Sequence, residues 1–326
     1  MLNPPPFSSS RRLRLPVIYP GFVASSPFLW RISLICFVLA AFPRSLPGQE
    51  FPPVTQSEVR QIQAVRSHTP IQIDGKVNEA EWQKAEWSPS FVDLISGSQT
   101  LHETRVKLLW DDKYLYVAYK IEEPFVTAKF TKRDSPIYRD NDVEFFIAGE
   151  DAYYEFEINA HGTIYEGLFV WQSNYESSGI AKLPKLDKTL DGVKWQAFNG
   201  VGYKSHPRGK RWAFLGWDYP GLKSAVHIDG TLNNNEDRDR GWTVELALPW
   251  KELRVLDLSS PRAIPPKRGD KWRMDFSRFN QYKEAPLASE DKSRDSGGWA
   301  LSYHGVWDSH IPEVFPIVTF IDDKKK

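Results

Sequence analysis

The sequence contains almost no cysteine. Cys36 is the one cysteine among 326 residues, and it lies in an N-terminal segment that we expect to be removed. The mature chain would then carry no thiol, which excludes disulfides, thiol nucleophiles and metals held by cysteine. An exported chain without disulfides must be stabilised by a sizeable hydrophobic core.

The sequence also lacks a surplus of either charge. Its 42 Lys and Arg residues equal its 42 Asp and Glu residues, so the formal net charge is zero. A basic surplus is the first mark of a protein that binds nucleic acid, and its absence argues against such a partner.

The apolar run near the N-terminus is too short to span a membrane. Residues 32–42 follow several arginines, and a stretch with small residues comes after them. A bilayer span needs about 20 apolar residues. The order of basic region, apolar core and small residues is typical of an export signal. We therefore expect a signal peptide over residues 1–48, no stable membrane span, and a secreted or periplasmic protein.

Aromatic residues, by contrast, are abundant. The chain has 13 Trp, 13 Tyr and 19 Phe, together with 24 Pro and 20 Gly, which suits strands and turns better than helices. Apolar and polar residues alternate over residues 104–121, around a turn of sequence DDK. We predict an all-β fold over residues 70–322: an immunoglobulin-like or jelly-roll-like β-sandwich of antiparallel strands, with few short helices. Residues 49–69 are expected to be a flexible segment, and residues 323–326 a basic tail.

The most unusual stretch is the acidic hairpin predicted over residues 140–159, of sequence DNDVEFFIAGEDAYYEFEIN. Its apolar residues alternate with acids, so one face belongs to the core and the other carries the carboxylates. With AGED as the turn, Glu144 is expected near Glu155, and Asp142 near Glu157. Like charges opposed across strands destabilise a sheet, so something should compensate for them.

Three interpretations of these acids remain open. The first is a solvated face neutralised by basic neighbours such as Arg105, Lys107, Arg273 or Arg278. The second is a face that binds a polar ligand, where carboxylates accept hydrogen bonds from hydroxyl groups. The third is a Ca²⁺ site that uses Asp140 and Asp142, because Ca²⁺ prefers several oxygen ligands.

Six stretches in the same order resemble the family 9 carbohydrate-binding modules and their relatives. They are IDGKVNEAEW, TRVKLLWDDKYLYVAYKIEEP, DNDVEFFI, YYEFEINAHGTIYE, GWTVELALPW and VWDSHIPEVFP. The resemblance covers residues 71–321. It implies a β-sandwich, bound Ca²⁺, and a sugar clamped between two aromatic rings.

The resemblance also implies site residues. Tyr138 matches the first clamp ring, Glu144 the acid that hydrogen-bonds the sugar, and Trp307 the second ring. Glu157 stands where the family has an arginine, which is a departure from its pattern. Further candidates for stacking are tryptophans in predicted loops, namely Trp171, Trp212 and Trp217.

We therefore predict a non-catalytic, secreted protein that binds poly- or oligosaccharide by aromatic stacking and polar contacts and acts in carbohydrate catabolism. Secreted glycoside hydrolases are its candidate partners. One alternative is a glycoside hydrolase that uses paired carboxylates. Another is a haem-binding domain of the same sandwich type with Met274 as axial ligand. Met274 alternates with Trp272 and Phe276, however, which favours a place in the core.

Overall fold

The computed structural model describes residues 50–281 and 295–322. The predicted signal peptide and basic tail lie outside these residues. Within the two described ranges, no helix is both long and apolar enough to cross a bilayer.

The fold is all-β, as predicted. The strands are β1 (Gln61–Arg66), β2 (Val92–Asp93), β3 (Thr104–Trp110), β4 (Tyr114–Ile121), β5 (Asp142–Ala148), β6 (Ala152–Asn159), β7 (Ile164–Trp171), β8 (Gln196–Phe198), β9 (Arg211–Phe214), β10 (Lys223–Asp229), β11 (Gly241–Pro249), β12 (Lys271–Phe279), β13 (Gly298–Ala300) and β14 (Ile317–Ile321). The helical elements are short: α1 (Gln172–Tyr175) and the 3-10 helices η1 (Gln56–Glu58), η2 (Ala80–Lys84), η3 (Ile137–Arg139), η4 (Ile180–Lys182) and η5 (Trp250–Asp257).

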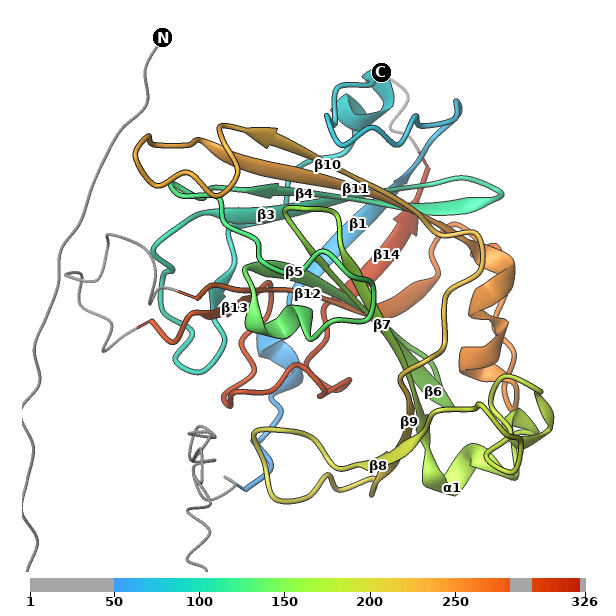
Figure 1. The fold of residues 1–326 in the computed structure, drawn as a ribbon. Coiled ribbons are helices and arrows are strands. Elements are labelled where there is room, and N and C mark those ends of the chain that lie inside the picture. The colour runs from blue at the N-terminus through green and yellow to red at the C-terminus, as the bar shows by residue number, and fades with distance from the viewer. Residues whose placement is uncertain (1–49, 282–294, 323–326) are drawn as a thin grey trace, which may run out of the picture. The chain divides into compact units, whose positions relative to one another are not determined.

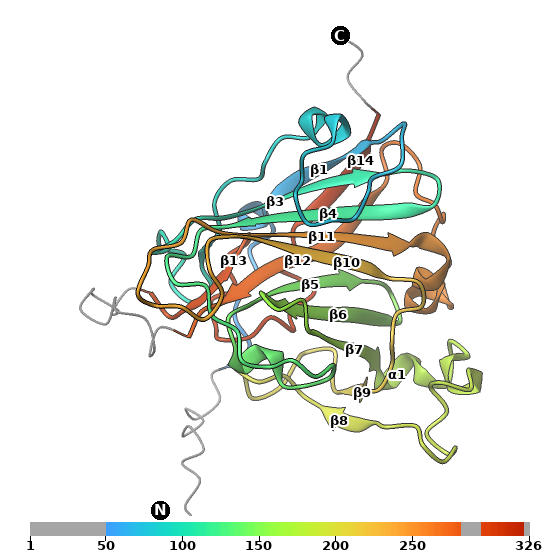
Figure 2. The ribbon, with the colours of Figure 1, turned by 45° about the horizontal axis from the view of Figure 1, so that its top comes forward.

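The strands follow one hydrogen-bonded order, β10-β11-β4-β3-β1-β14-β12-β5-β6-β7-β9-β8, while β13 pairs with β12 and β2. The sheet bends back on itself, so that β3, β4, β10 and β11 lie above β5, β6 and β7 in Figure 1. Figure 2 shows β5, β6 and β7 side by side. The two layers are those of a β-sandwich.

β1 shows that two predictions were wrong. The segment 49–69 was expected to be a flexible tether, whereas Gln61–Arg66 forms a strand between β3 and β14. β1 also runs parallel to both neighbours, although only antiparallel strands were predicted. Its sequence, QIQAVR, has little apolar character and therefore predicts the strand poorly. The strand becomes evident only from its position between β3 and β14.

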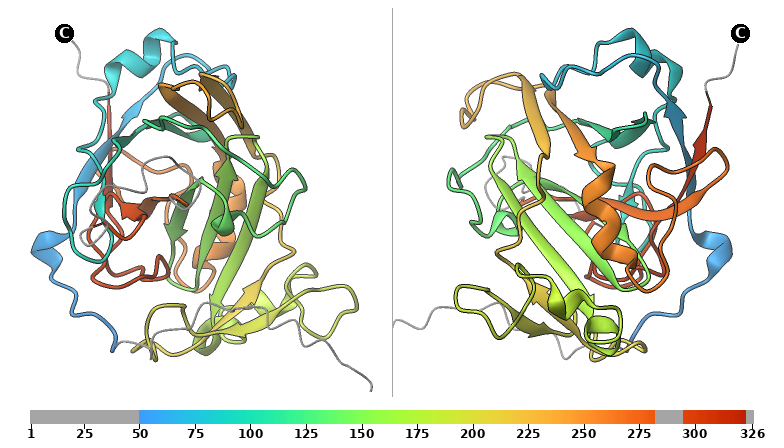
Figure 3. Two further views of the ribbon diagram at one scale, coloured as in Figure 1. Left: turned by 60° about the vertical axis from the view of Figure 1, so that its left-hand side comes forward. Right: turned by 90° about the vertical axis from the view of Figure 1, so that its right-hand side faces the viewer.

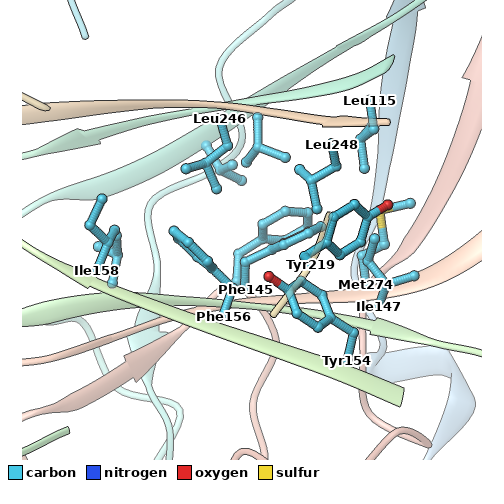
Figure 4. Packing of buried hydrophobic residues seen from close by; sticks show 14 of the residues in the cluster. Leu115, Phe145, Ile147, Tyr154, Phe156, Ile158, Tyr219, Leu246, Leu248 and Met274 are labelled. Carbon is cyan, nitrogen blue, oxygen red and sulfur yellow. The ribbon is translucent and has the colours of Figure 1, made fainter. Parts of the chain in front are cut away.

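The main core fills the space between the layers. Leu115, Leu246 and Leu248 approach it from one layer (Figure 4). Phe145 and Phe156 approach it from the other, and their rings are fully buried. Further members include Met274, Trp272 and Phe276. The alternation in the sequence therefore predicts this core correctly, and the position of Met274 in it agrees with its interpretation as a packing residue.

β9 and β10 were not predicted from the sequence. Trp212 was expected in a loop, but Arg211–Phe214 forms β9 against β7. Lys223–Asp229 forms β10 against β11. Both strands lie toward the ends of the strand order and are short or polar, so their sequences carry a weak signal.

The turn of the acidic hairpin is fixed by its neighbours. The amide of Gly149 donates to the carbonyl of Ala152 at 2.8 Å, and the amide of Asp151 donates to the carbonyl of Leu256 at 2.9 Å. A Cβ atom on Gly149 would overlap that Leu256 carbonyl, so the position requires glycine. Figure 3 shows η5, which carries Leu256, beside the strands of the hairpin.

Candidate functional site

The register of the acidic hairpin brings two glutamates face to face. Glu144 on β5 pairs with Glu157 on β6, and Phe146 pairs with Glu155. Asp142 lies opposite Asn159. The expected pairs, Glu144 with Glu155 and Asp142 with Glu157, are therefore wrong by two residues. The strand β5 continues through Ala148, so the turn falls one residue later than predicted, while the assignment of side chains to the two faces is unchanged.

The acidic face is buried, which contradicts the interpretation as a solvated surface. Asp142, Glu144, Glu155 and Glu157 are each at most 4 % exposed. The same outer face of the sheet carries a second apolar cluster, which the C-terminal segment covers. Its members include Phe146, Tyr153, Phe169, Ile311 and Phe315.

The basic residues that were expected to neutralise these acids bind elsewhere. Lys107 donates to the carbonyl of Trp82 at 2.9 Å, and Arg105 pairs with Glu103 at 2.6 Å. Arg273 and Arg278 contact other partners, among them the carbonyl of Glu313 and the carboxylate of Glu123.

A cavity of about 440 Å³ opens beside the glutamates. The structure brings together four residues predicted to bind carbohydrate, because Tyr138, Glu144, Glu157 and Trp307 all line this cavity. The lining also includes residues that the sequence did not single out as site residues: Glu155, Tyr165, Phe169, Gln196, Phe198, Val201, Leu215, Phe279, Asp308, Ser309 and His310.

Both predicted stacking rings are partly open to solvent. Tyr138, in η3, is 46 % exposed, and Trp307 is 40 % exposed. The ring of Trp307 is held by an edge contact with Phe279, with centroids 5.1 Å apart. A Cβ atom at Gly298 would lie 2.7 Å from the Trp307 ring, so this glycine leaves room for it. Partial exposure leaves each ring with surface that a ligand can cover.

Asp308 joins the two loops that form one wall of the cavity. Its Oδ2 accepts hydrogen bonds from the amides of Val201 and Gly202, at 2.6 and 3.0 Å, and its Oδ1 accepts one from the amide of His310 at 2.7 Å. The bonds from Val201 and Gly202 tie the segment after β8 to the segment before β14. The stretch VWDSHIPEVF contributes Trp307, Asp308 and His310, although its sequence shows no periodic pattern.

Burial dominates the electrostatics of the site. Desolvation raises the pKa of Glu144 to about 8, although a hydrogen bond from Ser277 at 3.1 Å opposes the shift. Desolvation, with the charges of neighbouring acids, raises the pKa of Asp142, Glu155 and Glu157 well above their ordinary values. Glu144 therefore retains most of its proton at neutral pH, and burial favours the protonated form of the other three acids as well.

These raised pKa values predict a loss of stability with rising pH. In the unfolded chain Glu144 ionises near its ordinary pKa of 4.5, whereas the folded protein holds the proton up to a pKa of about 8. The folded state thus binds more protons between these values, so the free energy of unfolding should fall as pH rises through this window. Between pH 6.5 and 8 this one carboxyl should account for a loss of up to about 2 kcal/mol.

Denaturant unfolding of the parent and of Glu144→Gln at pH 6.5 and pH 8 measures this effect. The free energy of unfolding should decrease less in the variant than in the parent. The difference between the two decreases gives the contribution of Glu144 apart from other titrating groups. A parent whose stability is unchanged or higher at pH 8, with the variant following the same course, would contradict the raised pKa.

The two predicted calcium ligands occupy different environments. Asp140 Oδ2 accepts hydrogen bonds from the amides of Lys129 and Phe130, at 2.7 and 3.1 Å, and from Asn159 Nδ2 at 3.0 Å. Asp142 Oδ1 accepts from the amide of Phe279 at 3.2 Å. Over residues 50–281 and 295–322, no group of three or more His, Cys, Asp or Glu side chains is arranged to hold a metal ion. The hydrogen bonds of Asp140 therefore explain its burial without a metal.

Bound calcium stays a prediction from the sequence. If calcium binds, EDTA should lower the melting temperature and added calcium should restore it, since an ion bound to the folded state alone stabilises that state. An unchanged melting temperature, together with no calcium in elemental analysis of the purified protein, would refute it.

The alternative tryptophans lie outside the lining of this cavity. Trp171 ends β7 and is buried, and Trp217 is buried in the main core. Trp212 lies in β9, where it packs edge-on against Trp195 with centroids 5.2 Å apart. The assignment of Trp171 and Trp212 to loops is therefore wrong.

Comparison with solved structures shows a fold shared with one of them. A crystal structure from Bacteroides uniformis, described as a "putative carbohydrate-binding protein", is 14% identical, with a TM-score of 0.50 over 80% of this chain and 99% of that chain. Two structures of a family 9 carbohydrate-binding module from Caldicellulosiruptor kristjanssonii, in complex with cellotriose and with glucose, are each 15% identical, with TM-scores of 0.42. They cover 81% of this chain and 94% and 98% of theirs, respectively.

Part of the sequence also matches the model of a protein family. No curated protein matches the chain. Residues 73–166 match the family described as "Carbohydrate family 9 binding domain-like", and this range includes both strands of the acidic hairpin. The resemblance to family 9 carbohydrate-binding modules is therefore confirmed.

Proposed function

We propose that the protein binds poly- or oligosaccharide in the cavity beside the acidic hairpin, without catalysing a reaction. The observation that carries this proposal is the combination of two half-exposed aromatic rings, Tyr138 and Trp307, with buried carboxyl groups in the lining of one cavity. The family match over residues 73–166 supports it.

The chemistry of the lining suits a sugar. Sugar rings present apolar C–H faces that pack on aromatic rings, and Tyr and Trp offer rigid contact area at a low cost in conformational entropy. Sugar hydroxyls donate hydrogen bonds to carboxylate oxygens. Glu144 and Glu157 would accept such bonds, and a cavity of about 440 Å³ lies in the range typical of small-molecule sites.

A depletion assay with a panel of soluble and insoluble polysaccharides tests the proposal. The parent should bind at least one polysaccharide, and Trp307→Ala should bind it more weakly by about 1–3 kcal/mol. Trp195→Ala is a matched control, because Trp195 is 42 % exposed and does not line the cavity. Equal binding by Trp307→Ala and the parent would refute the assignment of this cavity.

One observation favours a glycoside hydrolase as the second candidate function. Glu144, whose pKa burial raises to about 8, lies directly opposite Glu157. Glycosidases use a proton-holding carboxyl group together with a second carboxylate. Release of reducing ends from the bound polysaccharide, lost in both Glu144→Gln and Glu157→Gln, would favour this candidate over simple binding.

We also propose that the protein is exported and acts beside secreted glycoside hydrolases in carbohydrate catabolism. The basic and apolar N-terminal segment supports export. N-terminal sequencing of the mature protein should find a start after about residue 45, at the small-residue end of the signal. Exported material that still carries residues 1–40 would refute this prediction.

A further inference from the structure

The glutamates of the cavity differ in their partners from three buried acids elsewhere in the protein. Those three have cations or several N–H donors: Glu123 has Arg278 at 3.4 Å and the indole N–H of Trp242 at 2.7 Å, Asp257 has Arg262, and Glu245 accepts from the amides of Asp74 and Gly75 and from the indole of Trp82. Buried charges are normally matched in this way, because unmatched ones are costly.

The three glutamates of the cavity lack this compensation. The lining contains the carboxyl groups of Glu144, Glu155, Glu157 and Asp308, and none of its described lining residues is a lysine or an arginine. Of these four, only Asp308 accepts several hydrogen bonds from backbone N–H groups of the described residues. Glu157 is 2 % exposed, and its Oε2 has no hydrogen-bond partner within the described residues.

The histidine of the lining does not replace a permanent cation. His310 Nε2 lies 3.3 Å from Glu155 Oε1. Burial, with a contribution from the charge of Arg211, lowers the pKa of His310 well below its ordinary value, so the ring is neutral at pH 7. Without a cation the glutamates avoid the cost of a buried charge by favouring the protonated form, and a positive charge from outside the protein would let one of them release its proton to solvent and ionise.

We propose that the cavity is selective for sugars that carry a protonated amine, with the ammonium group beside Glu157 and the sugar ring against Tyr138 or Trp307. This inference rests on the proposed function and specifies its ligand class. An ammonium group donates charge-assisted hydrogen bonds to carboxylates and is attracted to the faces of aromatic rings. A neutral hydroxyl group supplies no positive charge, so it does not favour ionisation of the buried carboxyl group.

Three trisaccharides with the same β-1,4-linked backbone test this selectivity. They are cellotriose, the trimer of glucosamine and the trimer of N-acetylglucosamine, which differ in the substituent at C2 of each ring. Calorimetric titrations are made at a pH where the glucosamine amine is protonated. The glucosamine trimer is expected to bind on the order of tenfold more tightly than the other two.

The variant Glu157→Gln tests the position of the ammonium group. It retains the size of the side chain but cannot ionise, so most of the preference for glucosamine should disappear while the affinity for cellotriose changes little. Glu155→Gln is a second variant in case Glu157→Gln does not fold, and circular dichroism checks both. Glu176→Gln is the control, because Glu176 is exposed and does not line the cavity.

The outcomes separate this inference from the proposed function. Cellotriose that binds as tightly as the glucosamine trimer, or a preference unchanged in both cavity variants, overturns the amine selectivity and leaves carbohydrate binding intact. If none of the three sugars binds, the selectivity is also overturned, and the polysaccharide panel then decides the proposed function.

Discussion

Replacing Phe145 with alanine is expected to lower the free energy of unfolding by about 3–5 kcal/mol. The Phe145 ring is fully buried between the two layers and lies 5.4 Å from that of Phe276. Its removal would leave a cavity that the rigid strands on both sides cannot close. Denaturant unfolding of the parent and the variant measures the difference.

Leu190→Ala is the control for this prediction. Leu190 is 47 % exposed, so its truncation should change stability by no more than about 0.5 kcal/mol. A loss below 1 kcal/mol in Phe145→Ala would show that this ring does not pack between the layers as described.

Removing both rings of the cavity, in Tyr138→Ala/Trp307→Ala, is expected to weaken carbohydrate binding by about 2–5 kcal/mol, because each buried aromatic contact at a binding site is worth about 1–3 kcal/mol. The stability of the fold should change little, since both rings are about half exposed. Calorimetric titration with the polysaccharide selected from the panel measures the affinity.

A matched double variant, Tyr303→Ala/Trp195→Ala, controls for the loss of exposed aromatic surface. Its two rings are each 42 % exposed, and neither lines the cavity. This control should bind as the parent does. If both double variants lose the same affinity, general surface effects rather than the two cavity rings determine binding.

The sequence predicts the layers of this fold well, because each core strand shows its own alternation. Val143, Phe145 and Ile147 are all fully buried, and their spacing alone predicts this. The register of the hairpin was predicted less well. A turn placed one residue earlier or later preserves the two faces but moves each cross-strand pair by two residues.

The burial of the acids is not visible in the sequence of the hairpin. It results from segments far along the chain, including Phe198 and residues 301–315, which cover the outer face of β5 and β6. Asp308 connects these two segments through hydrogen bonds to backbone amides. Such long-range contacts leave no periodic signal, which is why the acids remained consistent with a solvated face.

The candidate ligand-binding residues were predicted only in part. The family resemblance supplied Tyr138, Glu144 and Trp307, and the structure places all three at one cavity. Glu157 stands where the family has an arginine. Because Glu157 is buried, this difference changes the chemistry of the cavity. A charged residue on an exposed strand would be solvated and would need no partner. In contrast, a buried carboxyl oxygen without a hydrogen-bond partner in the described part of the chain supports the proposed cationic ligand.

A crystal structure of the protein with a bound oligosaccharide tests the central claim most directly. The account predicts a sugar ring in the cavity, packed against Tyr138 or Trp307, with a polar group of the sugar within hydrogen-bonding distance of Glu144 or Glu157. A sugar bound at another surface, such as the exposed face of Trp195, with the cavity beside the acidic hairpin free of ligand, would contradict it.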